Sequence, residues 1–365
     1  MIDNVILATE NCRYCLMCRH VCPVSHVTRK ETLSPHGWGL TIASIRRGLL
    51  EMDEESVTVL YSCADCGTCR AHCVTDQPLP SAIAAIREEV VAKGLAPDSV
   101  SAIHEKLQRW GNPYADEEPG APAGQGDVAL FVGDDARYLD DETLNAALKL
   151  LEAVGIEPVL IGIGRNNGYL AASLGLHETA GELMRKTLAE LEDTGARTML
   201  VLGPGDNYAF DQMGHERLGI EWPANVALME LSVLLSDQLA AGTLNLASLP
   251  ARMPYAYIDP THSVRVTSRF DAPRSLVSAV MPAPPIELFW RRERTHPCGN
   301  VALQFTEPHI SDHLTYARLA DGRQSGAQLL ITDDPGTLYH LRKHAGLFEL
   351  DVQSLYQLMS NQLAN

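Results

Sequence analysis

The chain has 365 residues, with 46 Asp and Glu against 29 Lys and Arg, for a formal net charge of −17. This charge excludes nucleic acid and anionic membrane surfaces as main partners, because binding to both depends on neutralising phosphates. The length predicts two or three domains. No segment is long and apolar enough for a membrane span, and the N-terminus lacks the basic and apolar regions of a signal peptide. We therefore expect a cytoplasmic protein.

Eight of the nine cysteines form two copies of a CxxCxxCxxxC motif, which begin at Cys12 and Cys63. This is the spacing of bacterial-type proteins that carry two [4Fe–4S] clusters. The first three cysteines of each motif surround one cluster, and the fourth reaches across to the other. The expected ligands are Cys12, Cys15, Cys18 and Cys73 for cluster 1, and Cys63, Cys66, Cys69 and Cys22 for cluster 2.

Two other interpretations of the cysteines are weaker. Structural zinc typically uses two CxxC pairs, which would leave the third and fourth cysteines of each motif without a role. Disulfides would require an oxidising compartment, and a chain of this size can bury a core without them. Arg13, Arg19 and Arg70 lie inside the cysteine loops and would favour the reduced, more negative state of a cluster.

Residues 1–97 are expected to form a helical, two-cluster, ferredoxin-like domain. A turn-rich segment at 34–39 leads into a predicted helix that runs through Leu50, and apolar spacing predicts another helix over 81–93. Trp38 is expected to pack in the core under a cluster loop. Residues 98–126 are expected to hold a helix and a linker, because 112–127 are rich in Pro, Gly and acidic residues.

The pattern changes at Val128 to alternating strands and helices. Strands are predicted at 128–132, 157–161 and 198–202, with helices at 141–154 and over most of 168–191. This order is typical of a parallel sheet covered by helices. Strands at 255–258 and from Leu329 begin a second, similar half, so we expect two duplicated α/β repeats, at 127–248 and 249–365. The predicted fold class is α+β overall.

Paired cluster motifs followed by two α/β repeats resemble the heterodisulfide-reductase-like iron–sulfur proteins. That family includes the iron–sulfur subunits of glycolate oxidase and of anaerobic glycerol-3-phosphate dehydrogenase, and the D-type subunit of heterodisulfide reductase. In the family, each repeat is a cysteine-rich (CCG) domain whose turns can bind an extra cluster. Here the corresponding positions carry Asp134, Gly162–Gly164, Asp206, Thr261 and Asp334, and only Cys298 is kept. We therefore expect degenerate CCG repeats without a third cluster.

The repeats have two possible roles. They are a docking platform and lid over the clusters, or they bind a small molecule or hard metal through aspartates at loop ends beyond the parallel strands. Aspartate is also common in ordinary turns. Cys298 is expected to be an inert thiol, and the GxGxxxG sequence from Gly162 to be a tight turn rather than a dinucleotide loop. The candidate turn residues are Asp134, Asp206, Asp259 and Asp334.

The resemblance favours an electron-transfer subunit of an oxidoreductase complex over a chain that is catalytic by itself. It would pass electrons from a flavin-dependent dehydrogenase partner, which carries the flavin, to a quinone, an electron-transfer flavoprotein or a ferredoxin. The resemblance therefore implies a hetero-oligomer, and contact with the inner membrane would come through a partner. The alternative is a stand-alone oxidoreductase with its active site in the α/β repeats, fed by the two clusters.

Overall fold

The computed structural model describes residues 6, 9, 12–250 and 253–364. Its N-terminal part is helical, as expected. Ser34 caps α4 by accepting a hydrogen bond from the Gly37 amide, and Asp53 and Ser56 form a capping box at the start of α5. These helices are α2 (Met17–Val21), α3 (Pro23–Thr28), η2 (Glu31–Leu33), α4 (Pro35–Arg46), α5 (Glu54–Tyr61), α6 (Thr68–Ala71), α7 (Leu79–Ala92) and α8 (Asp98–Trp110).

Two of these helices differ slightly from their predicted bounds. The helix predicted through Leu50 begins at Pro35 and ends at Arg46, because Gly48 has a positive φ of 66° that ends the helical path. The helix predicted over 81–93 is α7, which begins two residues earlier, with Pro80 in its first turn.

The first α/β repeat contains a parallel sheet in the order β2-β1-β3-β4. Its strands are short and mostly apolar, as expected where both faces of a parallel sheet are covered. β4 was not predicted from the sequence, because its residues Ala-Leu-Met-Glu are all strong helix formers. The elements are β1 (Val128–Phe131), α9 (Asp134–Tyr138), α10 (Asp141–Ala153), β2 (Val159–Ile161), α11 (Tyr169–Leu174), α12 (His177–Thr194), β3 (Thr198–Val201), α13 (Pro204–Tyr208), the π-helix η3 (Ala209–Leu218), β4 (Ala227–Glu230) and α14 (Leu231–Ala240).

The second repeat contains a parallel sheet in the order β5-β6-β7. The order β3–α13–β4–α14 of the first repeat recurs as β6–α18–β7–α19 in the second. The duplication itself stays a prediction. The second sheet has no counterpart of β2 in the described part of the chain. The elements are β5 (Tyr255–Tyr257), η4 (Ser263–Arg265), η5 (Thr267–Arg269), α15 (Ala272–Val280), η6 (Arg292–Arg294), α16 (Leu303–Thr306), α17 (Pro308–Gln324), β6 (Leu329–Thr332), α18 (Pro335–Ala345), η7 (Gly346–Phe348), β7 (Asp351–Ser354) and α19 (Leu355–Ser360).

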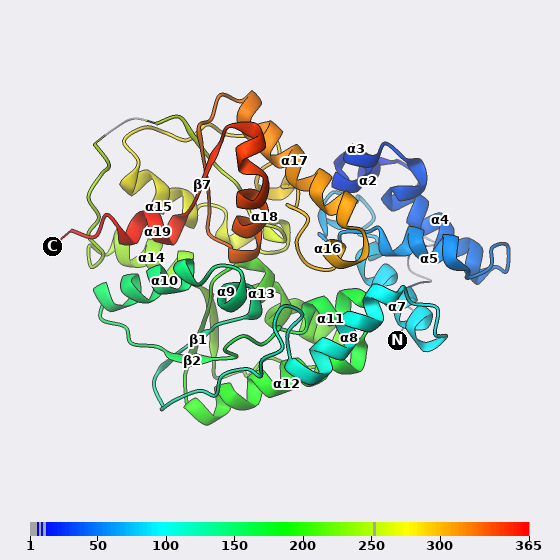
Figure 1. Cartoon of the computed structure of the whole chain (residues 1–365), viewed down its shortest axis with the longest axis horizontal. Helices are drawn as coiled ribbons and strands as arrows, with labels where there is room; N and C mark the ends of the chain where they lie inside the picture. The colour runs from blue at the N-terminus through cyan, green and yellow to red at the C-terminus, as the bar shows by residue number, and fades with distance from the viewer. Residues whose placement is uncertain (1–5, 7–8, 10–11, 251–252, 365) are drawn as a thin grey trace.

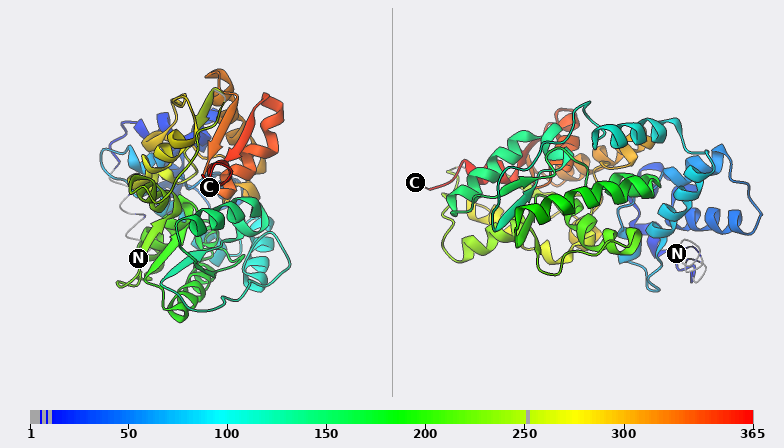
Figure 2. Two further views of the ribbon diagram at one scale, coloured as in Figure 1. Left: turned by 90° about the vertical axis from the view of Figure 1, so that its left-hand side faces the viewer. Right: turned by 90° about the horizontal axis from the view of Figure 1, so that it is seen from below.

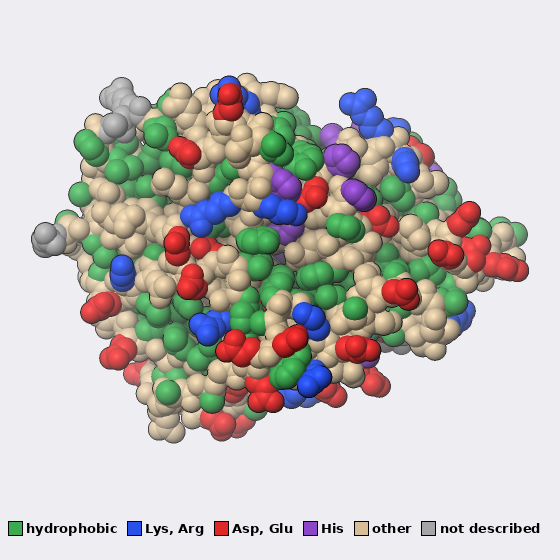
Figure 3. Space-filling model, in the orientation of Figure 1, with side chains coloured by type: hydrophobic (Ala, Val, Ile, Leu, Met, Phe, Trp, Pro, Cys, Tyr) green, Lys and Arg blue, Asp and Glu red, His purple; other side chains and the backbone are tan. Residues whose placement is uncertain are grey.

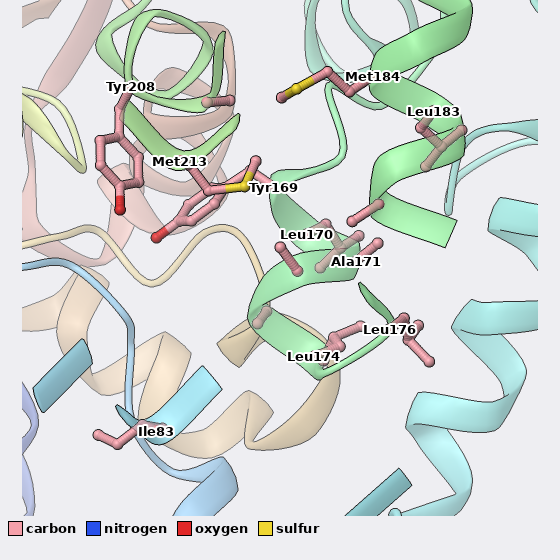
Figure 4. Close-up of a cluster of buried hydrophobic side chains, with 14 of the residues drawn as sticks. Ile83, Tyr169, Leu170, Ala171, Leu174, Leu176, Leu183, Met184, Tyr208 and Met213 are labelled. Carbon is pink, nitrogen blue, oxygen red and sulfur yellow. The ribbon is translucent and has the colours of Figure 1, made fainter. Parts of the chain in front are cut away.

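Alternating residues of β1 belong to different hydrophobic clusters. Ala129 and Phe131 pack with α11, α12 and the N-terminal helices, whereas Leu130 packs on the other face with α10, α14 and the second sheet. Figure 4 shows the first of these clusters, where Leu170 and Leu174 of α11 gather with Met184 of α12. The cores of the three parts are therefore continuous with one another.

The helical N-terminal part occupies one end of an elongated molecule, and the two repeats lie side by side at the other (Figures 1 and 2). The expectation of an α+β chain with parallel sheets is confirmed. In the space-filling view, acidic side chains gather at the tip of the N-terminal end (Figure 3), where Glu51, Asp53, Glu54 and Glu55 are exposed. Among the described residues, no helix is long and apolar enough to cross a membrane.

Candidate functional site

The eight motif cysteines line two adjoining cavities in the N-terminal part. Cys69 lines both cavities, so it forms part of the wall between them. The second cavity is narrower and lies beside the buried Trp38, whose indole donates a hydrogen bond to Ser62. Apart from Cys69, the first cavity is lined by Cys12, Cys15, Cys18 and Cys73, and the second by Cys22, Cys63 and Cys66. The first group is the set expected for cluster 1, and the second, with Cys69 added, is the set expected for cluster 2; the ligand assignment itself stays a prediction.

The two cavities differ in their exposure to solvent. Cys15 in the first cavity is exposed, whereas Cys22, Cys63 and Cys66 in the second are buried. Large apolar side chains surround the first cavity and are unusually exposed, with Leu49 at 77%. Others that line this cavity are Tyr14, Met17 and Leu40. An exposed apolar surface around a cofactor site is typical of a surface that contacts another molecule.

The donor chemistry fits iron–sulfur clusters. All nine cysteines are free thiols. Burial and the neighbouring Cys12 raise the pKa of Cys18 to about 11, and burial raises the pKa of Cys63 to about 12. Without metal these thiols stay protonated, so binding of iron would displace their protons. When bound, each cluster would accept and give up one electron at a time.

A buried arginine lies against the loop that carries Cys63. The Arg87 guanidinium, 1% exposed, donates to the carbonyl oxygens of Leu60, Cys63 and Ser173. Among the described residues no carboxylate forms an ion pair with it, and its charge acts to lower the pKa of both Cys63 and Asp65. The same charge would stabilise a negatively charged cluster bound beside it. Sequence reasoning missed this residue, because Arg87 follows the second motif inside helix α7 and nothing in its local sequence marks it.

The arginines predicted to influence the clusters are placed differently. Arg19 pairs with Glu31, and Arg70 pairs with Asp76 and Glu216, all at partly exposed positions. Their charges are therefore already balanced by carboxylates. Arg13 is exposed and lines the first cavity.

Asp65, between Cys63 and Cys66, joins the cluster loop to both repeats. Its carboxylate accepts two hydrogen bonds from Arg217, at 2.8 and 2.9 Å, and one from Arg265 at 2.9 Å. Burial would raise the pKa of Asp65, but Arg217 and Arg265 together hold it well below its usual range. Because Arg217 belongs to the first repeat and Arg265 to the second, one carboxylate connects three parts of the chain.

Three of the four candidate aspartates meet in a second kind of site, between the repeats. Asp134, Asp206 and Asp334 line one cavity at the carboxyl ends of β1, β3 and β6. Asp259 does not join them. It is buried in a two-fold hydrogen-bonded ion pair with Arg274, which also holds its pKa down despite burial. In this structure Asp259 therefore lies outside the cavity, and its carboxylate is engaged in an internal ion pair.

The cavity contains polar residues that were not predicted as site residues. Asp135 follows Asp134 at the start of α9 and accepts a hydrogen bond from the Tyr114 hydroxyl at 2.7 Å. Asn166 and Asn167, from the loop after β2, donate to Asp134 and Asp206 at 2.9 and 2.7 Å. These partners come from separate loops, so only the packing of the strands brings them together.

Burial raises the pKa of all four carboxyl groups of this cavity. Burial and repulsion by Asp206 raise the pKa of Asp134 to about 7. Burial and repulsion by Asp134 raise the pKa of Asp135 to about 7. Burial, with Asp334 nearby, raises the pKa of Asp206 to about 8. Burial and Asp135 raise the pKa of Asp334 to about 6. No described Lys, Arg or His forms an ion pair with these four groups, so each carries or loses a proton near neutral pH.

Two further sequence features are in the expected state. The turn from Gly162 to Gly168 follows β2, and a Cβ atom on Gly162 would lie 2.3 Å from Phe131, so it is a tight packing turn. Cys298 is fully buried, and burial raises its pKa to about 12, which makes it a poor nucleophile.

Residues 8–76 match the family model of the 4Fe-4S dicluster domain. The D-type subunit of dihydromethanophenazine:CoB–CoM heterodisulfide reductase from Methanosarcina barkeri is 23% identical over 297 residues, which cover 77% of this chain and 72% of the relative. The corresponding protein from Methanosarcina mazei is 22% identical over 327 residues, or 85% of this chain and 79% of the relative.

A solved structure has the same fold. The crystal structure of a hypothetical protein from Helicobacter pylori superposes with a TM-score of 0.65 at 12% sequence identity, covering 94% of this chain and 71% of that chain. At this identity the likeness extends to the fold alone.

Proposed function

Because this chain is an iron–sulfur protein similar to the D-type subunit of heterodisulfide reductase, we propose that it is the electron-transfer subunit of an oxidoreductase complex. It would receive electrons from a flavin-dependent dehydrogenase partner, which carries the flavin. It would pass them to a quinone, an electron-transfer flavoprotein or a ferredoxin. This role would place it in the cytoplasm, and at the inner membrane only through a partner.

The observation that carries the proposal is the arrangement of the two cysteine-lined cavities. They share Cys69, and they differ in exposure, since Cys15 of the first is exposed whereas Cys22, Cys63 and Cys66 of the second are buried. Two sites in contact, one exposed and one buried, suit a short path for electrons between the interior and the surface. The residues would hold cluster 1 with Cys12, Cys15, Cys18 and Cys73, and cluster 2 with Cys22, Cys63, Cys66 and Cys69.

The surface around the first cavity supports a protein partner at that position. Tyr14, Met17 and Leu49 expose apolar area beside the exposed Cys15, and the acidic tip before α5 lies on the same N-terminal part. Apolar contact would exclude water from the junction, and the acidic tip would steer a partner that carries a basic patch.

The repeats support a role other than cluster binding. The family positions that hold cysteine elsewhere carry Asp134, Asp206, Thr261 and Asp334 here, and Cys298 alone does not supply a ligand set. We therefore propose two clusters and no third one. The contacts of Asp65 with Arg217 and Arg265 make the repeats a platform that fixes the buried cluster loop.

The first test is an iron count on protein purified without oxygen. The wild type should contain about eight irons per chain, and Cys15→Ser and Cys66→Ser should each lose the spectroscopic signal of a different cluster. Cys298→Ser is the matched control, because Cys298 is buried but lines neither cluster cavity, and it should keep the full iron content. About ten or more irons in the wild type would overturn the two-cluster assignment.

The second test is purification of the untagged protein from its native host, followed by mass and flavin absorbance. A flavoprotein that travels with the chain supports the subunit assignment. In that complex, Cys15→Ser and Cys66→Ser should stop electron transfer to the acceptor while substrate still reduces the partner's flavin. A homogeneous chain with full iron content and no partner would favour the stand-alone oxidoreductase instead.

A further inference from the structure

The cavity between the two repeats is small, buried and acidic. It has a volume of about 60 Å³ and lies where the carboxyl ends of β1, β3 and β6 face one another. Four carboxyl groups line it, together with amide side chains and a few apolar groups, and the described lining contains no Lys or Arg. The carboxyl groups are those of Asp134, Asp135, Asp206 and Asp334.

A buried histidine in the wall of this cavity has no hydrogen-bond partner. His262 is 2% exposed, and neither ring nitrogen is bonded to a described group. Its ring contacts are aromatic, with Tyr169 at 4.7 Å and Tyr208 at 6.4 Å between centroids. Burial, with Arg265 nearby, lowers the pKa of His262 to about 3, so the ring is neutral and one nitrogen is free to accept a hydrogen bond. A ligand that donates to this nitrogen would remove the cost of leaving a buried polar group unsatisfied.

The backbone at the cavity is also strained. His262 has φ of 75°, and Val301, a β-branched residue, has φ of 74°. Both line the cavity. Residues other than glycine adopt such backbone angles at an energetic cost, and this kind of strain is concentrated at functional sites.

We propose that this cavity binds a small organic ammonium ion, with the four aspartates as charge partners and His262 as a hydrogen-bond acceptor. The proposal does not depend on the electron-transfer function. It assigns the repeats a ligand site of their own in place of the cluster that the family's cysteines would hold.

The chemistry of the wall selects this class of ligand. Without a cation in the wall, an anion would be repelled, and a ligand with N–H groups can donate to the carboxyl oxygens. The apolar wall, which includes Leu170, Leu202 and Val301, suits the carbon part of an amine. The volume is too small for a flavin or a dinucleotide.

Binding of a cation should be linked to proton release. In the empty cavity the pKa of Asp134 is about 7 and that of Asp206 about 8, so these groups are partly protonated at neutral pH. A bound ammonium favours their charged form, so its affinity should rise about tenfold between about pH 6 and about pH 8. The titratable groups that face these carboxyls are Tyr114, Asp135, Glu230, His262, Asp333 and Asp334.

The test is isothermal titration calorimetry of the full, cluster-loaded chain with ethylammonium chloride. We expect one site per chain, an affinity that rises with pH across neutrality, and a heat that depends on the ionisation enthalpy of the buffer. Asp206→Asn keeps the shape of the side chain and should weaken binding at least about tenfold, because a charge-assisted hydrogen bond is lost. Asp237→Asn, at an exposed position of α14, is the matched control and should bind as the wild type does.

A second variant keeps the test independent of the aspartates. His262→Asn retains a residue type that tolerates positive φ, and it should bind more weakly while iron content and far-ultraviolet circular dichroism stay unchanged. Absence of binding to the wild type, or equal binding to wild type and Asp206→Asn, would overturn the proposal. Binding of manganese(II) in place of ethylammonium would overturn it as well, because the site would then be a metal site. Each of these outcomes leaves the iron count untouched, so failure here is distinct from failure of the electron-transfer proposal.

Discussion

Replacement of Arg269 is expected to weaken the contact between the two repeats strongly. The Arg269 guanidinium, fully buried in η5, forms ion pairs with Glu230 at the end of β4 and with Asp333 after β6. It also donates to the Ser263 hydroxyl at 3.0 Å. The variant Arg269→Met keeps a side chain of similar length but leaves two buried carboxyl groups without their cation.

The size of the effect follows from these contacts. Loss of one partner of a buried ion pair costs about 3–5 kcal/mol. Unfolding entropy is about 2.1 cal/mol/K per residue, which for 365 residues gives about 0.8 kcal/mol/K. A loss of about 4 kcal/mol should therefore lower Tm by about 5 °C.

The assay is thermal unfolding of the cluster-loaded protein without oxygen, followed by tryptophan fluorescence. Arg197→Met is the matched control, because Arg197 and Asp127 form an ion pair with side chains that are 74% and 77% exposed. Such a pair contributes about 0–1 kcal/mol, so the control should lower Tm by about 1 °C or less. Replacing Glu230 and Asp333 with their amides in the Arg269→Met background should recover part of the loss, since the uncompensated charges are gone. Equal Tm values for Arg269→Met and Arg197→Met would refute this reasoning.

Two further predictions concern the contacts of the cluster domain. Gly175→Ala should destabilise the protein by about 1–3 kcal/mol more than Gly195→Ala. Both glycines have positive φ, but a Cβ at Gly175 would lie 2.5 Å from the Arg87 backbone, whereas Gly195 has open space; equal urea midpoints for the two variants would contradict the clash. Arg87→Gln should lower the reduction potential of the buried cluster by about 40–90 mV, for a lost interaction of about 1–2 kcal/mol. A redox titration followed by electron paramagnetic resonance measures the reduction potential. Arg70→Gln is the control, because Arg70 is already paired with carboxylates. A shift for Arg87→Gln no larger than that for Arg70→Gln would contradict the proposed role of Arg87.

The sequence predicted the local features of the site well and the long-range ones poorly. The CxxCxxCxxxC spacing is local, so it is sufficient to propose both ligand sets, and runs of apolar residues mark the strands that end before Asp134, Asp206 and Asp334. Because parallel strands of one sheet end at the same edge, Asp134 and Asp206 could be expected near each other. Asp334 follows β6 of the other sheet, and only the packing of the two repeats brings it into the same cavity. Asp259 has the same local pattern, and only the fold shows that Arg274 occupies its carboxylate.

The contacts missed from the sequence join residues that are far apart in the chain. Asp65 and Arg217 are separated by 152 positions, and Asp65 and Arg265 by 200. No periodicity or spacing connects such residues. The importance of His262 depends on its ring nitrogens having no partner among the described groups, which is a property of the packed structure and not of the surrounding sequence.

The contacts of Asp65 have a consequence for maturation of the protein in the cell. Asp65 lies between two proposed iron ligands, and its carboxylate holds an arginine from each repeat. If these cysteines bind the clusters as proposed, cluster insertion and closure of the three parts would be linked equilibria, and each would favour the other. A chain made under iron shortage would leave this junction loose and would become a substrate for proteases, so iron supply would set the abundance of the protein as well as its redox competence.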